Sequence, residues 1–537
     1  MILLFKYKRK VVKHYTSLFF IIITALFIVL FSNLSFFEHV IKIYPVEVAN
    51  IGFLLSLALL LYALLVVIFS LFTFKYTTKP VLIFTLLLSA SVQYFMQSYN
   101  IVMDKTMIEN TLQTDMKESF DLLSTKLFLS IFLLGILPSF ILYKLPLRYR
   151  SFKTELWSKF KLIMLHIALI AVLLFSFSKF YTSFFREHRT LRLYTNPTAS
   201  IYNTVAYTYE KLKDRTIPMK IIGKDAQIKA HAQRKRKIVI MVVGEAARAD
   251  HFSLNGYKKE TNPLLQKEDI INFTNMYSCG TTTAVSVPCM FSVYDRDEYN
   301  TNKGYNTYNA LDVLSHAGVE VLWRDNNSDS KGVAVRLKYE HYKTPLLNTI
   351  CENDECRDEG MLIGLNEVIN TNKKDIIIVL HQMGNHGPAY YLRYPEKFKK
   401  FTPVCQTNQL EECNKNDISN AYDNAILYTD YFLFQVITLL KQHSKTSDTA
   451  MIYMADHGES LGENGFYLHG LPYFMAPDHQ KHVAALMWFS KNFPIDKNAL
   501  KTRSNEEYTH DNLFSTLLGI FNVQTKEYEK EMDILRY

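Results

Sequence analysis

The chain has 537 residues, of which 49% are hydrophobic and 14% aromatic, so it is long enough for more than one domain and too apolar for a disordered scaffold. The formal net charge of +9 does not indicate nucleic-acid binding, because the basic residues of the N-terminal third lie between apolar segments, where they mark membrane orientation. Almost all long apolar runs precede residue 182, whereas the six cysteines all follow residue 278. The composition therefore separates a membrane part from a globular part.

Five apolar segments in the first third predict membrane-spanning helices. Each approaches or exceeds the roughly 17 to 25 residues that are needed to cross the hydrocarbon core of a bilayer. The first segment has no small-residue cleavage site and four more follow it, so we interpret it as a retained helix and not as a signal peptide. The five segments cover residues 16–34, 51–74, 81–96, 127–143 and 162–180.

The charges beside these segments predict their orientation. Lysine and arginine gather before the first segment, between the second and third, and between the fourth and fifth, whereas the loops 35–50 and 97–126 are acidic. The excess of basic residues in cytoplasmic loops predicts a cytoplasmic N-terminus. With five spans, everything after residue 182 is then expected outside the cytoplasm.

The six cysteines form three couples that are close in sequence. Three local disulfides are the simplest connectivity and suit the oxidising side of a membrane, although six cysteines permit fifteen pairings. No couple has zinc-knuckle spacing with a second matching couple. The couples are Cys279 with Cys289, Cys351 with Cys356, and Cys405 with Cys413.

Aromatic and polar residues alternate from residue 180 to residue 233. This pattern is typical of segments that lie in the membrane interface, and the alternative is an ordinary linker packed on the globular part. We therefore divide the chain into a five-helix membrane domain at 1–181, an interfacial linker at 182–236 and a catalytic domain at 237–537.

The catalytic domain alternates strand-like apolar runs with helical patterns. This alternation predicts the α/β class, with a mostly parallel sheet covered by helices. In such sheets the chemistry gathers beyond the carboxyl ends of the strands. The runs cover residues 238–243, 319–323, 376–380, 450–455 and 484–489.

Candidate ligands follow two of these runs directly. Glu245 follows the first, and the pair Asp456 and His457 follows the fourth. Two carboxylates and an imidazole suit zinc better than magnesium or calcium. A Gly/Thr-rich turn that includes Thr283 leads into a predicted helix; a threonine there is either a helix cap or a nucleophile that bound zinc activates.

Five motifs of the second half of the chain carry a family resemblance. They are Val-Val-Gly-Glu245-Ala-Ala-Arg-Ala-Asp, Cys-Gly-Thr-Thr-Thr283-Ala-Val-Ser-Val-Pro-Cys, Trp-Arg-Asp-Asn-Asn-Ser328-Asp-Ser-Lys331-Gly, His-Gln-Met-Gly-Asn-His386-Gly-Pro-Ala-Tyr and Asp456-His457-Gly-Glu-Ser-Leu-Gly-Glu-Asn-Gly-Phe-Tyr-Leu-His469-Gly. With these motifs the chain is similar to the inner-membrane phosphoethanolamine transferases that modify lipid A, a group that includes the mobile colistin-resistance enzymes, within the alkaline phosphatase and sulfatase superfamily.

The resemblance implies a role for each candidate residue, and three local disulfides. Thr283 would be the nucleophile, and His386 or His469 the general acid or base. The implied zinc ligands are Glu245, Thr283, Asp456 and His457. Phosphoethanolamine or additional zinc would be bound by Ser328, Lys331, His386 and His469. Three polar residues near the donor lipid would share one helical face by their spacing, although a solvated face is the alternative: Asn110, Thr114 and Glu118.

The implied activity is zinc-dependent transfer of phosphoethanolamine from phosphatidylethanolamine to lipid A through a phosphoethanolamine-threonine intermediate, which confers polymyxin resistance. Core oligosaccharide is an alternative acceptor. The implied location is the bacterial inner membrane, with a cytoplasmic N-terminus and a periplasmic catalytic domain, and we expect a monomer. The alternatives are a phosphodiesterase or glycerol phosphate transferase of the same superfamily, and an inactive membrane scaffold.

Overall fold

A computed structural model describes residues 14–114, 116–214, 218–229, 234–352 and 355–536. Packing divides the chain into two compact units. The first comprises Met1–Asp104 and Leu123–Val205, and the second comprises Lys105–Leu122 and Ala206–Tyr537. The segment Lys105–Leu122, which lies between two predicted spans, therefore packs with the second unit. The domain boundaries predicted at residues 181 and 236 place this segment in the membrane domain instead.

The first unit is helical. By length and composition, four of its helices could cross a membrane, and a fifth span exists if the bent pair of α1 and α2 is one span. The helices are α1 (Ser17–Phe31), α2 (Leu34–Ile43), α3 (Val48–Phe72), α4 (Thr78–Tyr99), α7 (Thr125–Ser130), the π-helix η1 (Ile131–Ile136), α8 (Leu137–Lys144), α9 (Phe152–Ser176), α10 (Ser178–Glu187), the 3-10 helix η2 (Arg189–Tyr194) and the start of α11 (Thr198–Asp214), whose remainder belongs to the second unit.

The first and last spans differ from the sequence prediction. The first bends by 55° between α1 and α2, where the Asn33 amide donates to the backbone oxygens of Ile28 at 3.0 Å and Asn196 at 2.8 Å. The last span, predicted at 162–180, lies in a helix that begins at Phe152 and ends at Ser176. The first turns of this helix contain charged residues, so a search for apolar runs places its start too late.

The second unit contains an eight-stranded sheet with the order β13-β3-β12-β9-β2-β8-β4-β5. β12 runs antiparallel to both its neighbours, and the other neighbouring pairs run parallel, so the mostly parallel sheet is confirmed. The five predicted runs lie in β2 (Arg236–Gly244), β4 (Glu320–Asp325), β8 (Ile376–His381), β9 (Ser447–Ala455) and β12 (His482–Phe489). The sequence prediction missed β3 (Ile270–Tyr277), β5 (Lys338–His341) and β13 (Tyr508–Thr509).

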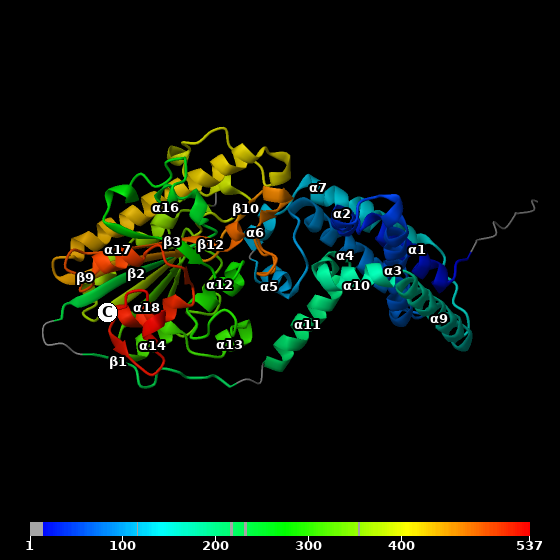
Figure 1. The fold of residues 1–537 in the computed structure, drawn as a ribbon, viewed down its shortest axis with the longest axis horizontal. Helices are drawn as coiled ribbons and strands as arrows, with labels where there is room; N and C mark the ends of the chain where they lie inside the picture. Colours follow the sequence, from blue (N-terminus) through cyan, green and yellow to red (C-terminus); the bar gives the residue numbers. More distant parts are fainter. Residues whose placement is uncertain (1–13, 115, 215–217, 230–233, 353–354, 537) are drawn as a thin grey trace, which may run out of the picture. The chain divides into compact units, whose positions relative to one another are not determined.

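Helices cover both faces of this sheet. Figure 1 shows the long helix α16 (Lys415–His443) over one face, and α14 (Ala310–His316) with α18 (Asn512–Ile520) over the other. β2, β8 and β9 are almost entirely buried, as expected for apolar parallel strands between two helical layers. The other helices of this unit include α12 (Thr283–Met290), α13 (Thr301–Tyr305), α15 (Leu365–Thr371) and α17 (Lys497–Arg503).

The segment Lys105–Leu122 forms α5 (Lys105–Gln113) and α6 (Met116–Asp121). Two carboxylates join it to the rest of the second unit. Glu109 accepts a hydrogen bond from the Thr301 hydroxyl at 3.1 Å, and Asp121 pairs with the guanidinium of Arg393 at 2.8 Å. The segment is thus a structural part of the globular unit although the first unit precedes and follows it in the chain.

The cysteines form three disulfides between sequence neighbours, as predicted. They join Cys279 to Cys289, Cys351 to Cys356 and Cys405 to Cys413. The first disulfide joins the start of the Gly/Thr-rich turn to Cys289 in the last turn of α12. The turn that presents Thr283 is therefore covalently tied to the helix that follows it.

Candidate metal centre

Two adjacent parallel strands bring the first ligands together. Gly244 and Ala455, the last residues of β2 and β9, are paired in register, so the residues that follow them leave the sheet side by side. These are Glu245 on one strand and Asp456 with His457 on the other, and all three are fully buried. The carboxyl edge of the sheet therefore presents two carboxylates and one imidazole at a single place.

Helix α12 supplies the fourth group, because it begins at Thr283. The Thr283 hydroxyl oxygen lies 3.1 Å from Oε2 of Glu245 and 3.3 Å from Nε2 of His457. A second helix residue, Ser286, donates its hydroxyl hydrogen bond to the backbone oxygen of Asp456. The helix is thereby fixed against the segment that carries two of the ligands, and the Thr283 hydroxyl lies beside Glu245 and His457.

The arrangement of donor atoms fits a bound cation. One ligand atom from each of Glu245, Asp456 and His457 lies within 4.8 Å of the others. Among the described residues, Oε1 of Glu245 and Oδ2 of Asp456 are buried without a hydrogen-bond partner. Nδ1 of His457 lies 2.8 Å from the backbone oxygen of Gly458 and donates to it, which leaves Nε2 available as a ligand. Two carboxylates, an imidazole and a hydroxyl suit zinc.

The electrostatics of the cluster show the same need for positive charge. Burial, reinforced by the Glu245 carboxylate, raises the pKa of Asp456 to about 6. Burial also raises the pKa of Glu245, but the imidazoles of His457, His386 and His469 outweigh it and lower that pKa overall. A divalent cation between the carboxylates would favour the ionised form of both.

Two further histidines lie beside this cluster. The ring of His469 is centred 4.2 Å from that of His457 and 6.2 Å from that of His386. Nδ1 of His469 lies 3.3 Å from a carboxylate oxygen of Glu459. Burial raises the pKa of Glu459 to about 8, with the Glu245 charge adding to the effect. The structure thus places both predicted phosphate-binding histidines next to the candidate metal ligands.

Ser328 and Lys331 follow β4 in the same unit. Lys331 is 6% exposed, and its ammonium nitrogen lies 3.4 Å from the backbone oxygen of Gln113 at the end of α5. Ser328 donates its backbone hydrogen bond to the Asn327 side chain at 2.6 Å. Lys331 therefore contacts the segment Lys105–Leu122, and Ser328 is adjacent to a residue that contacts Glu245.

The expected single helical face of Asn110, Thr114 and Glu118 is wrong, because the segment forms two helices. Asn110 lies on α5, which ends at Gln113, and Thr114 follows it. The Thr114 hydroxyl donates back to the backbone oxygen of Asn110 at 2.8 Å, a bond that competes with helix continuation. The side chain of Glu118 lies outside the described residues.

Sequence reasoning gives no role to Asn327 or Glu459 beside the site, and it marks His381 only as a polar residue at the end of a strand. Asn327 donates from its amide to Oε2 of Glu245 at 2.8 Å, and Glu459 contacts His469 as described above. His381 at the end of β8 pairs with Asp325 at 2.9 Å. Asp325 ends the buried strand β4 and Asn327 follows it, as the candidate ligands follow β2 and β9. Their position at the end of a strand could therefore have indicated that they lie near the site.

Comparison with known proteins gives matches over nearly the whole chain. Residues 61–212 match the family model described as phosphoethanolamine transferase EptA/EptB, and residues 237–523 match the sulfatase model. The phosphatidylethanolamine transferase Mcr-1 of Escherichia coli is 44% identical over 524 residues, which cover 95% of this chain and 96% of the relative. The chain belongs to the phosphoethanolamine transferase family.

Other members of this transferase family agree in sequence and in fold. The phosphoethanolamine transferase EptA of Escherichia coli K12 is 38% identical over 526 residues, covering 96% of each chain. The solved structure of lipooligosaccharide phosphoethanolamine transferase A from Neisseria meningitidis superposes with a TM-score of 0.93 at 36% identity, covering 96% of this chain and 98% of that one. The fold of this phosphoethanolamine transferase is therefore that of an integral membrane enzyme with a sulfatase-like catalytic domain.

Proposed function

We propose that this enzyme transfers phosphoethanolamine from phosphatidylethanolamine to lipid A through a covalent intermediate on Thr283. The observation that carries the proposal is the position of the Thr283 hydroxyl, 3.1 Å and 3.3 Å from two of three clustered ligand candidates. Relatives with 44% and 38% identity are named as transferases of the same group. The phosphate groups of lipid A are the acceptor we favour, and a core sugar hydroxyl is the alternative.

In the first step, the Thr283 oxygen attacks the phosphorus of the donor and the bond from phosphorus to the diacylglycerol oxygen breaks. The hydroxyl proton has a carboxylate acceptor 3.1 Å away in Glu245. Zinc held by Glu245, Asp456, His457 and Thr283 would supply Lewis-acid chemistry, lowering the pKa of the hydroxyl and offsetting phosphoryl charge. His386 or His469 would donate a proton to the departing diacylglycerol oxygen, a role that suits imidazole near neutral pH.

In the second step, an oxygen of the lipid A phosphate attacks the same phosphorus and the bond to the Thr283 oxygen breaks. The Thr283 oxygen regains its proton from Glu245, the histidine that protonated diacylglycerol takes a proton from the attacking phosphate hydroxyl, and the enzyme returns to its starting state. Lys331 and Ser328 would bind the phosphoethanolamine group, and a buried ammonium such as that of Lys331 stabilises the charge on the phosphoryl oxygens. Asn110, Thr114 and Glu118 would contact the donor lipid.

The enzyme would lie in the inner membrane as a monomer with five spans. The basic residues before the first span and the acidic loops support a cytoplasmic N-terminus. Three disulfides support a periplasmic catalytic domain, because that compartment is oxidising. Modification of lipid A phosphates would reduce the negative surface charge that cationic polymyxins bind, and so confer resistance to them.

The test uses the full-length protein in detergent with phosphatidylethanolamine labelled in the ethanolamine group. We expect label on Thr283 of the wild type, loss of labelling in Thr283→Ala, and transfer to added lipid A. Thr282→Ala is the matched control, because that neighbouring hydroxyl is equally buried and has no hydrogen-bond partner among the described residues.

Other outcomes would contradict the proposal. Labelling from the glycerol phosphate of phosphatidylglycerol would identify a glycerol phosphate transferase, and release of label to water alone would identify a phosphodiesterase. Unchanged metal content in Asp456→Ala, together with unchanged polymyxin survival of cells that express Thr283→Ala, would favour an inactive scaffold.

A further inference from the structure

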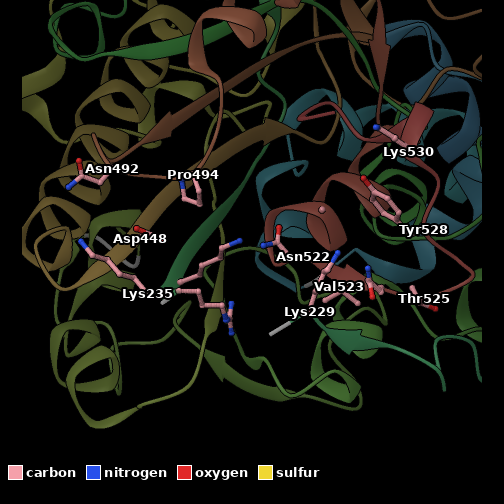
Figure 2. Close-up of a pocket in the computed structure, with 14 residues that line it drawn as sticks. Lys229, Lys235, Asp448, Asn492, Pro494, Asn522, Val523, Thr525, Tyr528 and Lys530 are labelled. Carbon is pink, nitrogen blue, oxygen red and sulfur yellow. The ribbon is translucent and has the colours of Figure 1, made fainter. Parts of the chain in front are cut away.

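A cavity lies at the edge of the sheet opposite the metal centre, where β2 and β9 begin. It has a volume of about 1070 Å³. Figure 2 shows Lys235 and Asp448 on one side of it and Lys229, Asn522 and Val523 on the other. The second side is formed where β1 (Gln227–Ile228) pairs with β14 (Val523–Gln524).

The lining of this cavity is strongly cationic. Its charged residues are a single carboxylate, that of Asp448, and five cationic side chains, those of Lys229, Arg234, Lys235, Lys237 and Lys530. Of these cations, Arg234 forms an ion pair, with Asp375 at 2.6 Å. In the described part of the chain, no carboxylate oxygen lies within 4.0 Å of the ammonium groups of the four lysines. The cavity therefore carries an excess of positive charge that the protein itself does not neutralise.

One of these cations, Lys237, is held away from solvent, and Arg234 is half-buried, which distinguishes the cavity from a patch of solvated lysines. Lys237 is 2% exposed, and its ammonium donates to the backbone oxygen of Ile520 at 2.6 Å. Burial and the Arg234 charge lower the pKa of Lys237 to about 8, against the opposing effect of Asp375 and Asp448. This lysine is still mainly protonated at neutral pH.

Arg234 provides an unused donor at the same place. One terminal nitrogen of its guanidinium bonds Asp375, whereas the other, Nη1, is buried without a hydrogen-bond partner among the described residues. Buried donors in proteins are nearly always paired. An oxygen-rich anion would satisfy this group and the lysines together, since arginine and lysine are the residues that bind phosphate in charge-assisted hydrogen bonds.

We propose that this cavity binds a phosphate-bearing anion, with Arg234, Lys235 and Lys237 as its main cationic ligands. The site is separate from the metal centre, because β2 runs from one to the other. Nine residues, Arg236–Gly244, extend over roughly 30 Å at about 3.3 Å per residue. The bound group is either a free phosphate compound or the phosphate of a lipid headgroup, which present the same oxygens.

The experiment measures anion binding to the full-length protein in detergent by calorimetry, after removal of metal with a chelator so that the metal centre does not contribute. The probes are inorganic pyrophosphate and the water-soluble lipid dihexanoyl phosphatidylglycerol. Loss of one charge-assisted bond should weaken binding about tenfold or more in Lys237→Met, and about threefold in the exposed Lys235→Ala and Lys229→Ala. The control is Lys258→Ala, an exposed lysine that does not line the cavity.

The outcomes separate the possible sources of the anion. Pyrophosphate binding that these three substitutions weaken, and Lys258→Ala does not, supports a site for a free phosphate compound. Binding of the lipid probe alone, with the same dependence, supports a headgroup site. The proposal is overturned if neither probe binds, or if Lys235→Ala and Lys229→Ala weaken binding no more than Lys258→Ala does. These two exposed variants keep the test valid should Lys237→Met fail to fold.

Discussion

Substitution of Asn327 by alanine should weaken metal binding although Asn327 is not a ligand candidate. Its amide donates to Oε2 of Glu245 at 2.8 Å and to the backbone oxygen of Gln382 at 2.8 Å, and the residue is 1% exposed. A hydrogen bond to a charged group contributes about 1.5 to 3 kcal/mol, which corresponds to about 10- to 150-fold in a dissociation constant. We expect zinc affinity to fall within this range, as is usual for groups that orient metal ligands.

The assay is competition for zinc between the detergent-purified protein and a chromogenic chelator, with the melting temperature recorded for each variant. Asn326→Ala is the matched control. Asn326 is equally buried, and its amide donates to Cys356 and Asp358 and not to Glu245. The reasoning is refuted if Asn327→Ala binds zinc within twofold of the wild type, or if Asn326→Ala loses as much affinity at a comparable change in melting temperature.

Three further outcomes are expected. Burial raises the pKa of Asp430 to about 7, so the folded state holds a proton that the unfolded state releases near pH 4. The stability of the fold should therefore fall as pH rises from about 4 to 7. Asp430→Asn should reduce the loss of melting temperature between pH 5 and pH 8, and an unchanged loss would contradict this. The Arg393 guanidinium pairs with Asp121 at 2.8 Å and with Glu355 at 3.0 Å. Arg393→Met removes both buried ion pairs and should destabilise the protein by about 3 to 5 kcal/mol. Asp121→Asn should cost less in denaturant unfolding, and the opposite order would count against the argument. A Cβ at Gly458 would lie 2.1 Å from the backbone oxygen of His479. Gly458→Ala should therefore displace the loop after β9 and reduce the bound zinc that mass spectrometry measures. Full zinc occupancy would exclude such a displacement.

The sequence predicted the strands that are apolar along their whole length. β2, β8 and β9 are buried on both faces, so their residues form continuous apolar runs with an abrupt polar end. β3 alternates between buried and half-buried positions, and β5 is mostly exposed. These strands carry no such run, which explains why they were missed.

The candidate ligands were recognisable because two parallel strands end in register. Residues that follow Gly244 and Ala455 must then be neighbours, whichever helices intervene. Asn327 also follows the end of a buried strand, but its contact with Glu245 depends on the course of the chain after β4, which the strand pattern does not predict. The bend at Asn33 and the early start of α9 depend in the same way on tertiary contacts and on charged turns, which composition does not reveal.

Because Lys105–Leu122 belongs to the globular unit, recombination between such enzymes has to include this segment. A catalytic region transplanted from a relative as one continuous stretch after residue 205 would leave this segment behind. The transplant would then carry Arg393 without Asp121 and Thr301 without Glu109. Recombination between relatives should therefore succeed when it replaces both pieces together, and the two pieces should change in step during divergence.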